Sequence, residues 1–199
     1  IPKISSSFNK FEFLRDLKSE GSIKARSITR SLVESWIDED YNLLSKEFKV
    51  EAIVSRITSW SFNYSWFAES GRLNFQKKLL HSIALQTKFL ELKLIDSKDH
   101  LEKIVIIKGI IVGQSILYEE IININDLLDL LEDELQFLIN RDGGHKTRSP
   151  ILQIELLRHL IELRSVVAIL KNIDAANLHK QTIKMGEFCR SFQMPNGYF

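Results

Sequence analysis

Apolar residues recur every three or four positions along most of the chain, a spacing typical of helices with one buried face. Gly21-Ser22 separates the first two segments, and Ser22 can cap the second. Residues 62–67 form an aromatic-rich connection, and Gly71 breaks the chain again. The pattern predicts helices over residues 8–17, 22–36, 50–62, 73–94, 98–118, 125–141, 149–170 and 174–192.

The segment over residues 98–118 is apolar on most of its circumference from Ile104 onward, which predicts a central, buried helix. Its β-branched residues would also suit a strand. Gly109 and Gly113 favour the helix, because glycines four residues apart offer a smooth surface for a neighbouring helix. Lys108 is the single charged residue within residues 104–117.

The same spacing indicates which side chains face the core. The second helix runs through Ile23, Ile28, Leu32, Val33 and Trp36 as its apolar positions. The helix that begins at Asn125-Asp126 is expected to turn its leucines inward and its acidic residues outward. These leucines are Leu127, Leu128, Leu130, Leu131, Leu135 and Leu138, and the acidic residues are Glu132, Asp133 and Glu134.

Seven or eight helices joined mostly by short connections imply antiparallel neighbours. We therefore expect an all-α protein and, within that class, an incomplete (α/α) toroid of antiparallel helical hairpins. A compact helical bundle is the alternative. The length of 199 residues suits one helical domain spanning residues 1–199.

The composition excludes several classes of partner. The 27 Lys and Arg nearly balance the 26 Asp and Glu, so neither nucleic acid nor a membrane is an expected partner. The longest apolar run is too short to span a bilayer, and we expect a soluble protein of the periplasm or cytoplasm. Cys189 is the only cysteine, which excludes an intrachain disulfide, and Phe188 and Phe192 nearby predict that its thiol is buried.

Neither a metal nor a cofactor is expected. The acidic runs over residues 38–40 and 132–134 have no histidine at ligand spacing and are typical of solvated faces. His81, His159 and His179 lie within predicted helices without evident polar neighbours, and His100 follows Asp99, a natural helix cap. The chain has no glycine-rich phosphate loop after a strand, no nucleophile elbow and no helix-borne zinc motif.

Residues 141–150, Arg-Asp-Gly-Gly-His-Lys-Thr-Arg-Ser-Pro, interrupt the helical pattern. His145 and Arg148 precede Ser149-Pro150, a pair that fits the N-cap and first turn of a new helix. Together they could hold an anion and move a proton at that helix N-terminus. Alternatively, the glycines end the preceding helix, His145 is a capping side chain and Arg148 a surface cation.

The aromatic residues between the third and fourth helices also have two interpretations. Flat ring faces can stack on sugars, and the same rings can pack in a core. The residues are Trp60, Phe62, Tyr64, Trp66 and Phe67.

Asp142-Gly143-Gly144-His145 followed by Arg148-Ser149-Pro150 resembles a motif of the heparinase II/III-like polysaccharide lyases. Residues 8–17, 108–113 and 194–199 resemble further segments of that family in order and spacing. The resemblance implies an incomplete (α/α) toroid normally followed by a β-sandwich domain. This chain is then expected to be the helical N-terminal domain and to contact the β-sandwich domain.

Lyases of this family cleave uronic-acid polysaccharides by β-elimination, in which a cation or amide neutralises the C5 carboxylate and a Tyr or His removes the C5 proton. The resemblance implies catalytic roles for His145, as base or neutraliser, and for Arg148, as a carboxylate-binding cation. Active relatives commonly carry Tyr and His where this chain has Leu152 and Gln153. The substrate-binding residues implied in the same way are Asp142, Gly144, Ser149 and Tyr198.

The expected ligand is accordingly an acidic polysaccharide or oligosaccharide, with cleavage by β-elimination as the expected activity of the full-length protein. Two alternatives remain open. One is a carbohydrate-binding or structural relative without catalysis, and the other is a helical protein-interaction module.

Overall fold

The computed structural model describes residues 8–39, 49–118, 121, 123–171 and 173–192. Within these ranges the chain is all-α, as predicted. The described residues form no strand, and their β-type pairing is limited to an isolated bridge between Ile139 and His145. A short 3-10 helix, η1 (Phe8–Lys10), precedes the α-helices. These are α1 (Leu14–Glu20), α2 (Ile23–Asp38), α3 (Val50–Phe67), α4 (Leu73–Asp96), α5 (His100–Leu117), α6 (Ile124–Leu138), α7 (Pro150–Val167) and α8 (Ala176–Arg190).

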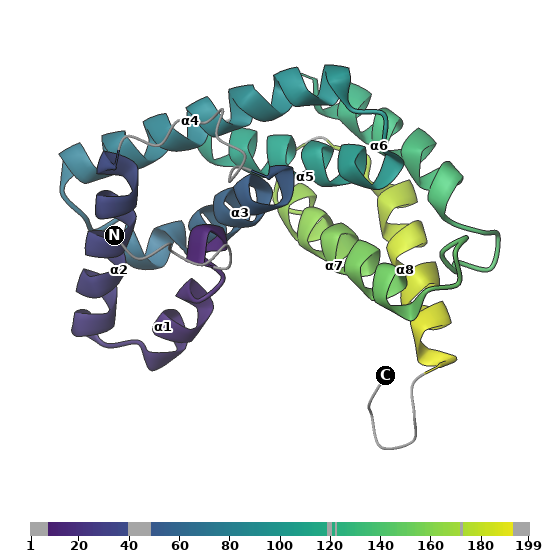
Figure 1. Ribbon diagram of the computed structural model, residues 1–199, viewed down its shortest axis with the longest axis horizontal. Coiled ribbons are helices and arrows are strands. Elements are labelled where there is room, and N and C mark those ends of the chain that lie inside the picture. Colours follow the sequence, from purple (N-terminus) through teal and green to yellow (C-terminus); the bar gives the residue numbers. More distant parts are fainter. Residues whose placement is uncertain (1–7, 40–48, 119–120, 122, 172, 193–199) are drawn as a thin grey trace.

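Helix α5 lies at the centre of the molecule and contacts α3, α4, α6 and α7 (Figure 1). Residues 104–113 are buried without interruption, so this helix has no solvent-facing side over nearly three turns. The prediction of a central buried helix is confirmed. Because all sides of the helix are covered, its β-branched residues pack against neighbouring helices rather than forming a strand.

Two glycines of α5 allow this close packing. A Cβ atom on Gly109 would lie 2.6 Å from both Leu90 Cδ1 and Val54 Cγ2, and one on Gly113 would lie 2.1 Å from Thr87 Oγ1. Side chains at both positions would therefore collide with α3 or α4. The predicted smooth surface exists and faces these two helices.

Local capping signals set several helix boundaries. Gly21 adopts a left-handed conformation (φ 75°) at the end of α1, and the Ser22 side chain accepts a hydrogen bond from Ala25 N at the start of α2. Asp99 caps α5 by accepting from Glu102 N. The predicted breaks at these positions are confirmed.

The aromatic residues at 62–67 belong to α3, so the prediction of a connection there is wrong. Asn63 and Phe67 continue the buried stripe of Ile53, Ile57 and Trp60 at helical spacing, and no glycine or proline intervenes before Gly71. Burial of Phe67, which is fully inaccessible, therefore carries the helix past residue 62.

Two other expectations about facing are also wrong. Ile23 and Ile28 are 85% and 42% exposed, because α2 buries a stripe spaced by four, four and three that ends at Trp36. Glu134 is buried rather than solvent-facing, since its carboxylate accepts hydrogen bonds from His100 Nδ1 (2.5 Å) and Lys103 Nζ (2.6 Å) of α5. Burial raises the pKa of Glu134, but these two partners outweigh it and lower the pKa overall.

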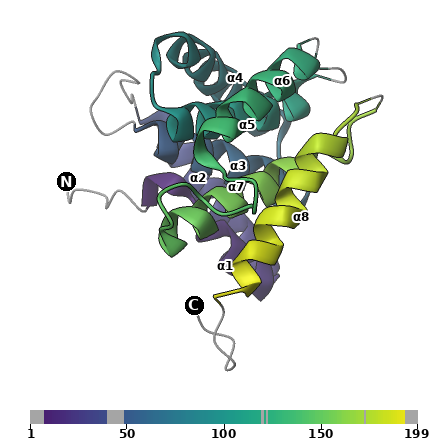
Figure 2. The same ribbon diagram turned by 90° about the vertical axis from the view of Figure 1, so that its right-hand side faces the viewer.

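The helices at the two ends of the chain lie on opposite sides of the molecule. Figure 1 shows α1 and α2 at one side of the molecule and α7 and α8 at the other, with α4 across the top of the view. Figure 2, turned by 90°, shows α8 in front of α7, and the two helices contact each other. None of the described helices combines the length and hydropathy required to cross a membrane.

Candidate functional site

A polar cleft of about 510 Å³ lies between the N-terminal segment, α3, α5 and α7. Its lining joins segments that are far apart in the sequence. The residues that line the polar cleft are Glu12, Arg15, Lys18, Ser55, Thr58, Ser59, Phe62, Asn63, Lys108, Arg158 and Glu162.

Helical spacing brings the α3 residues to one wall of the cleft. Ser55, Ser59 and Phe62 are four and three residues apart, so they share a helix face. The opposite face carries Ile57 and Trp60, which are fully buried. Phe62 is 41% exposed and lines the polar cleft, so one ring of the aromatic segment is available to a ligand.

Lys108 lies at the inner end of the polar cleft, with only 2% of its surface exposed. Its Nζ donates to Glu162 Oε2 (2.5 Å) and approaches His159 Nδ1 at 3.2 Å. Burial lowers the pKa of Lys108, and the adjacent Glu162 carboxylate opposes that effect. An ammonium group has three donors, so one remains after these two contacts.

His159 is held neutral in this environment. Burial, and then the charges of Lys108 and Arg158, lower its pKa to about 3. A neutral imidazole can accept a hydrogen bond from Lys108 Nζ at Nδ1, and the ring's own hydrogen then lies on Nε2. The sequence-based view that His159 lacks polar company is therefore wrong, because Lys108 reaches it from 51 positions away.

The lining of the polar cleft has an excess of positive charge. Arg158 Nη1 lies 3.9 Å from Glu12 Oε1 and links α7 to the N-terminal segment. Around them are hydroxyl and amide side chains that can both donate and accept. The charged lining residues are four cations and two carboxylates: Arg15, Lys18, Lys108, Arg158, Glu12 and Glu162.

The loop between α6 and α7, where the sequence predicts a site, is a tightly bonded turn. Asn140 N donates to Gly144 O (2.8 Å), Lys146 N to Leu138 O (2.7 Å) and Arg148 N to His145 O (2.8 Å). Gly143 has φ 87°, and a Cβ atom there would lie 2.6 Å from Lys184 O of α8. Glycine is thus required by both the backbone conformation and the contact with α8.

Gln153 of α7 connects this loop to α8. Its side chain accepts from His145 N (2.5 Å) and donates to Gly143 O (3.0 Å) and Met185 O (3.3 Å). Gln153 is 1% exposed, so these bonds satisfy buried backbone groups. Gln153 therefore has a structural role in this chain.

The structure brings five of the six predicted site residues together in the loop. Arg148 Nη1 donates to Asp142 Oδ2 (2.8 Å), and Gly144 N donates to Asp142 Oδ1 (2.9 Å). Both hydrogen bonds lower the pKa of Asp142, and the bond from Gly144 N has the larger effect. Ser149 caps α7 by accepting from Leu152 N (3.4 Å), as predicted. Tyr198 lies outside the described residues.

His145 is 3% exposed, and burial lowers its pKa. Its Nδ1 accepts from Thr147 N (3.2 Å), so the neutral ring carries its hydrogen on Nε2. Nε2 is buried without a hydrogen-bond partner among the described residues. His145 also lines a hollow of about 310 Å³ with Arg148 and Phe188. In this tautomer Nε2 can act only as a hydrogen-bond donor.

The polar cleft and the loop hollow share no lining residue. Sequence reasoning found the loop and missed Arg158 and Glu162 of the cleft. The available signal was Lys108, a lone charge in an apolar helix. Cys189 is buried as predicted, and burial raises its pKa.

Comparisons with protein-family models, with curated proteins and with solved structures find no match to this chain.

Proposed function

We propose that the polar cleft binds an acidic oligosaccharide, and that the chain is the helical part of a polysaccharide lyase similar to the heparinase II/III-like family. In this proposal the helices are hairpins of an incomplete (α/α) toroid. The observation that carries the proposal is the lining of the polar cleft, which combines excess positive charge, hydroxyl and amide groups, and an exposed ring.

Each component of the lining suits a part of an acidic sugar. Arg15 and Arg158 provide guanidinium groups, whose paired donors match a carboxylate. Ser55, Ser59 and Asn63 can bond sugar hydroxyls in either direction. Phe62 can stack on the apolar face of a sugar ring.

The resemblance to the lyases supports the same cleft. The segment over residues 8–17 contributes Glu12 and Arg15, and the segment over residues 108–113 contributes Lys108. These are two of the segments that resemble the family, and they meet in space although about 90 residues separate them. The resemblance and the cleft chemistry are independent reasons to expect a uronate ligand here.

For β-elimination, a base removes the C5 proton, the C4–C5 double bond forms, and the bond from C4 to the glycosidic oxygen breaks as that oxygen takes up a proton. The cations of the polar cleft would stabilise the negative charge that develops on the carboxylate. His145 lines the separate loop hollow and its Nε2 is buried, so the proposal gives the neutralising role to the cations of the polar cleft. In the proposal the base comes from the β-sandwich domain that the family resemblance implies.

A binding screen combined with an activity assay distinguishes the proposal from its alternatives. Uronic-acid oligosaccharides and their carboxyl-reduced, neutral counterparts are offered to the protein, and ultraviolet absorbance reports any unsaturated uronide. The proposal predicts binding of the acidic forms, and a lyase predicts unsaturated product whose yield falls in Arg15→Gln/Arg158→Gln.

Binding of acidic oligosaccharides without formation of unsaturated product would favour the alternative of a carbohydrate-binding protein without catalysis. No binding to any acidic oligosaccharide would contradict the proposal.

A further inference from the structure

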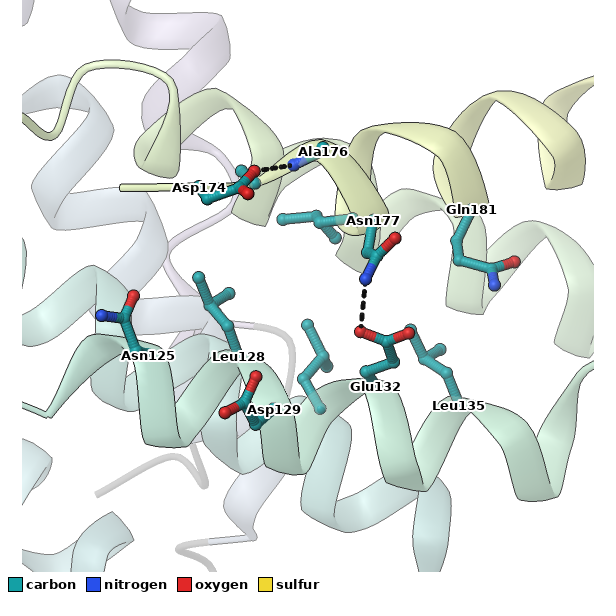
Figure 3. A pocket seen from close by; sticks show the side chains of 12 residues that line it. Asn125, Leu128, Asp129, Glu132, Leu135, Asp174, Ala176, Asn177 and Gln181 are labelled. Atoms are coloured by element: carbon teal, nitrogen blue, oxygen red, sulfur yellow. Dashed lines mark hydrogen bonds between the residues drawn. The ribbon is translucent and has the colours of Figure 1, made fainter. Parts of the chain in front are cut away.

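A third depression, between α6 and α8, has a volume of about 390 Å³ (Figure 3). We call it the acidic groove. Its lining residues are Asn125, Leu128, Asp129, Leu131, Glu132, Leu135, Asp174, Ala175, Ala176, Asn177, Leu178 and Gln181.

The floor of the acidic groove is apolar. Leu131, Leu135 and Leu178 are 2%, 4% and 6% exposed, and Leu128 lies one helical turn before Leu131 on α6. Figure 3 shows the α6 and α8 side chains facing each other across the groove. The three buried leucines are closed off by the core, whereas Leu128 and Ala175 are only partly buried and provide the apolar surface that a partner's side chains can cover.

The rim carries charge of one sign only. Asp129, Glu132 and Asp174 line the acidic groove, and its described lining contains no Lys, Arg or His. Asn177 Nδ2 donates to Glu132 Oε2 (2.9 Å), and Asp174 caps α8 by accepting from Ala176 N (3.0 Å). Asp129 makes no hydrogen bond or ion pair with any described residue.

We propose that the acidic groove docks a basic amphipathic helix of a protein partner. Charge complementarity selects the occupant, because three carboxylates without a cation favour Lys or Arg and disfavour acidic segments. The leucine floor requires apolar side chains between those cations. The eleven residues from Asn125 to Leu135 span about 15 Å of helix axis, enough for about three turns of a second helix.

This arrangement belongs to the helix-in-groove mode of recognition, in which apolar residues at helical spacing anchor the segment. The partner's apolar residues at i, i+3 or i+4, and i+7 contact the floor, and its cations meet Asp129 and Asp174. The proposal does not depend on sugar binding, because the polar cleft and the acidic groove share no lining residue.

The test uses a synthetic helical peptide of 14 Leu and Lys residues, with Leu at i, i+3, i+4 and i+7. Fluorescence anisotropy measures its binding to the wild type and to the double variant Asp129→Asn/Asp174→Asn. Asparagine retains the capping ability of Asp174. The matched control is Asp126→Asn/Asp133→Asn, which removes two exposed carboxylates of α6 outside the groove.

We expect the peptide to bind the wild type and the control equally, and the groove variant at least tenfold more weakly. A peptide of the same composition without an apolar face, and one with Glu in place of Lys, should both bind at least tenfold more weakly than the amphipathic peptide. Equal affinity for both double variants would overturn the proposal, as would equal binding of the rearranged peptide. Circular dichroism of each variant verifies that the helices remain folded.

Discussion

Lys108 and His159 form a buried polar contact between α5 and α7. An isolated charge in such a place is costly, and here Glu162 and the neutral imidazole compensate it. The arrangement depends on His159 remaining uncharged, since protonation would place two cations 3.2 Å apart. The protonation state of one histidine is thus coupled to folding.

His159→Gln should reduce the pH dependence of stability. The folded pKa of His159 is about 3 against an ordinary 6.5, so between these values the unfolded chain binds a proton that the folded protein does not. Stability from this group is therefore lost as pH falls below 6.5. From pH 7 to pH 4 the wild type should lose on the order of 3 kcal/mol more than the variant, in which glutamine can still accept from Lys108.

Urea unfolding at pH 4, 5, 6 and 7 measures this difference. Parallel stability profiles for the wild type and His159→Gln would show that His159 titrates normally in the folded protein.

Gln153 is a second residue whose role can be tested by itself. Gln153→Leu would leave His145 N, Gly143 O and Met185 O without their partner in a buried region. Since each unpaired buried group costs about 1–3 kcal/mol, the variant should lose at least about 2 kcal/mol of unfolding free energy. Arg148→Gln is the comparison, and it should lose less than about 1 kcal/mol because the ion pair with Asp142 is exposed.

Denaturant unfolding of both variants provides the measurement. If Arg148→Gln proves the more damaging of the two, the loop is held together by its ion pair rather than by Gln153.

Among the elements, α5 determines how closely the others approach. Its glycines face α3 and α4, where added methyl groups have no room, whereas a methyl group added to Gly186 of α8 would meet no heavy atom within 4 Å. The same substitution should therefore have opposite effects in the two helices. Alanine is favoured over glycine in helices by about 1 kcal/mol where nothing obstructs it.

Gly109→Ala should destabilise the protein and Gly186→Ala should stabilise it slightly. Overpacking of a core costs about 1–3 kcal/mol, which exceeds the gain in helix propensity. Thermal unfolding of the two variants measures the sign of each effect. A stabilised Gly109→Ala variant would mean that Val54 and Leu90 can move aside.

Helix caps and the central helix are the features that the sequence predicts best. The caps at Ser22, Asp99 and Ser149 depend on bonds within three residues, so local rules predict them. The central helix followed from its composition alone. The burial of Glu134 and the neighbours of His159 could not be predicted, because their partners lie 31 to 51 positions away.

At the scale of the whole molecule, a nearly neutral chain separates its charges. The polar cleft carries excess positive charge, and the acidic groove carries only negative charge, although the net charge is +1. The near balance of charges in the composition says nothing of this separation. The sequence predicted the loop at residues 141–150 as the site, whereas the cleft arises from segments that only the fold brings together.

Binding of an acidic oligosaccharide in the polar cleft should depend on the cations that line it. Isothermal titration with a uronic-acid tetrasaccharide, for the wild type and for Arg15→Gln/Arg158→Gln, measures this dependence. Lys77→Gln, which removes an exposed cation of α4 outside the cleft, is the control.

We expect the double variant to bind at least tenfold more weakly, a loss of about 1.4 kcal/mol or more. Lys77→Gln should bind as the wild type does, and the carboxyl-reduced tetrasaccharide should bind none of the three proteins measurably. Unchanged affinity of the double variant, or equal affinity for the neutral sugar, would show that the cations of the polar cleft do not bind the acidic sugar.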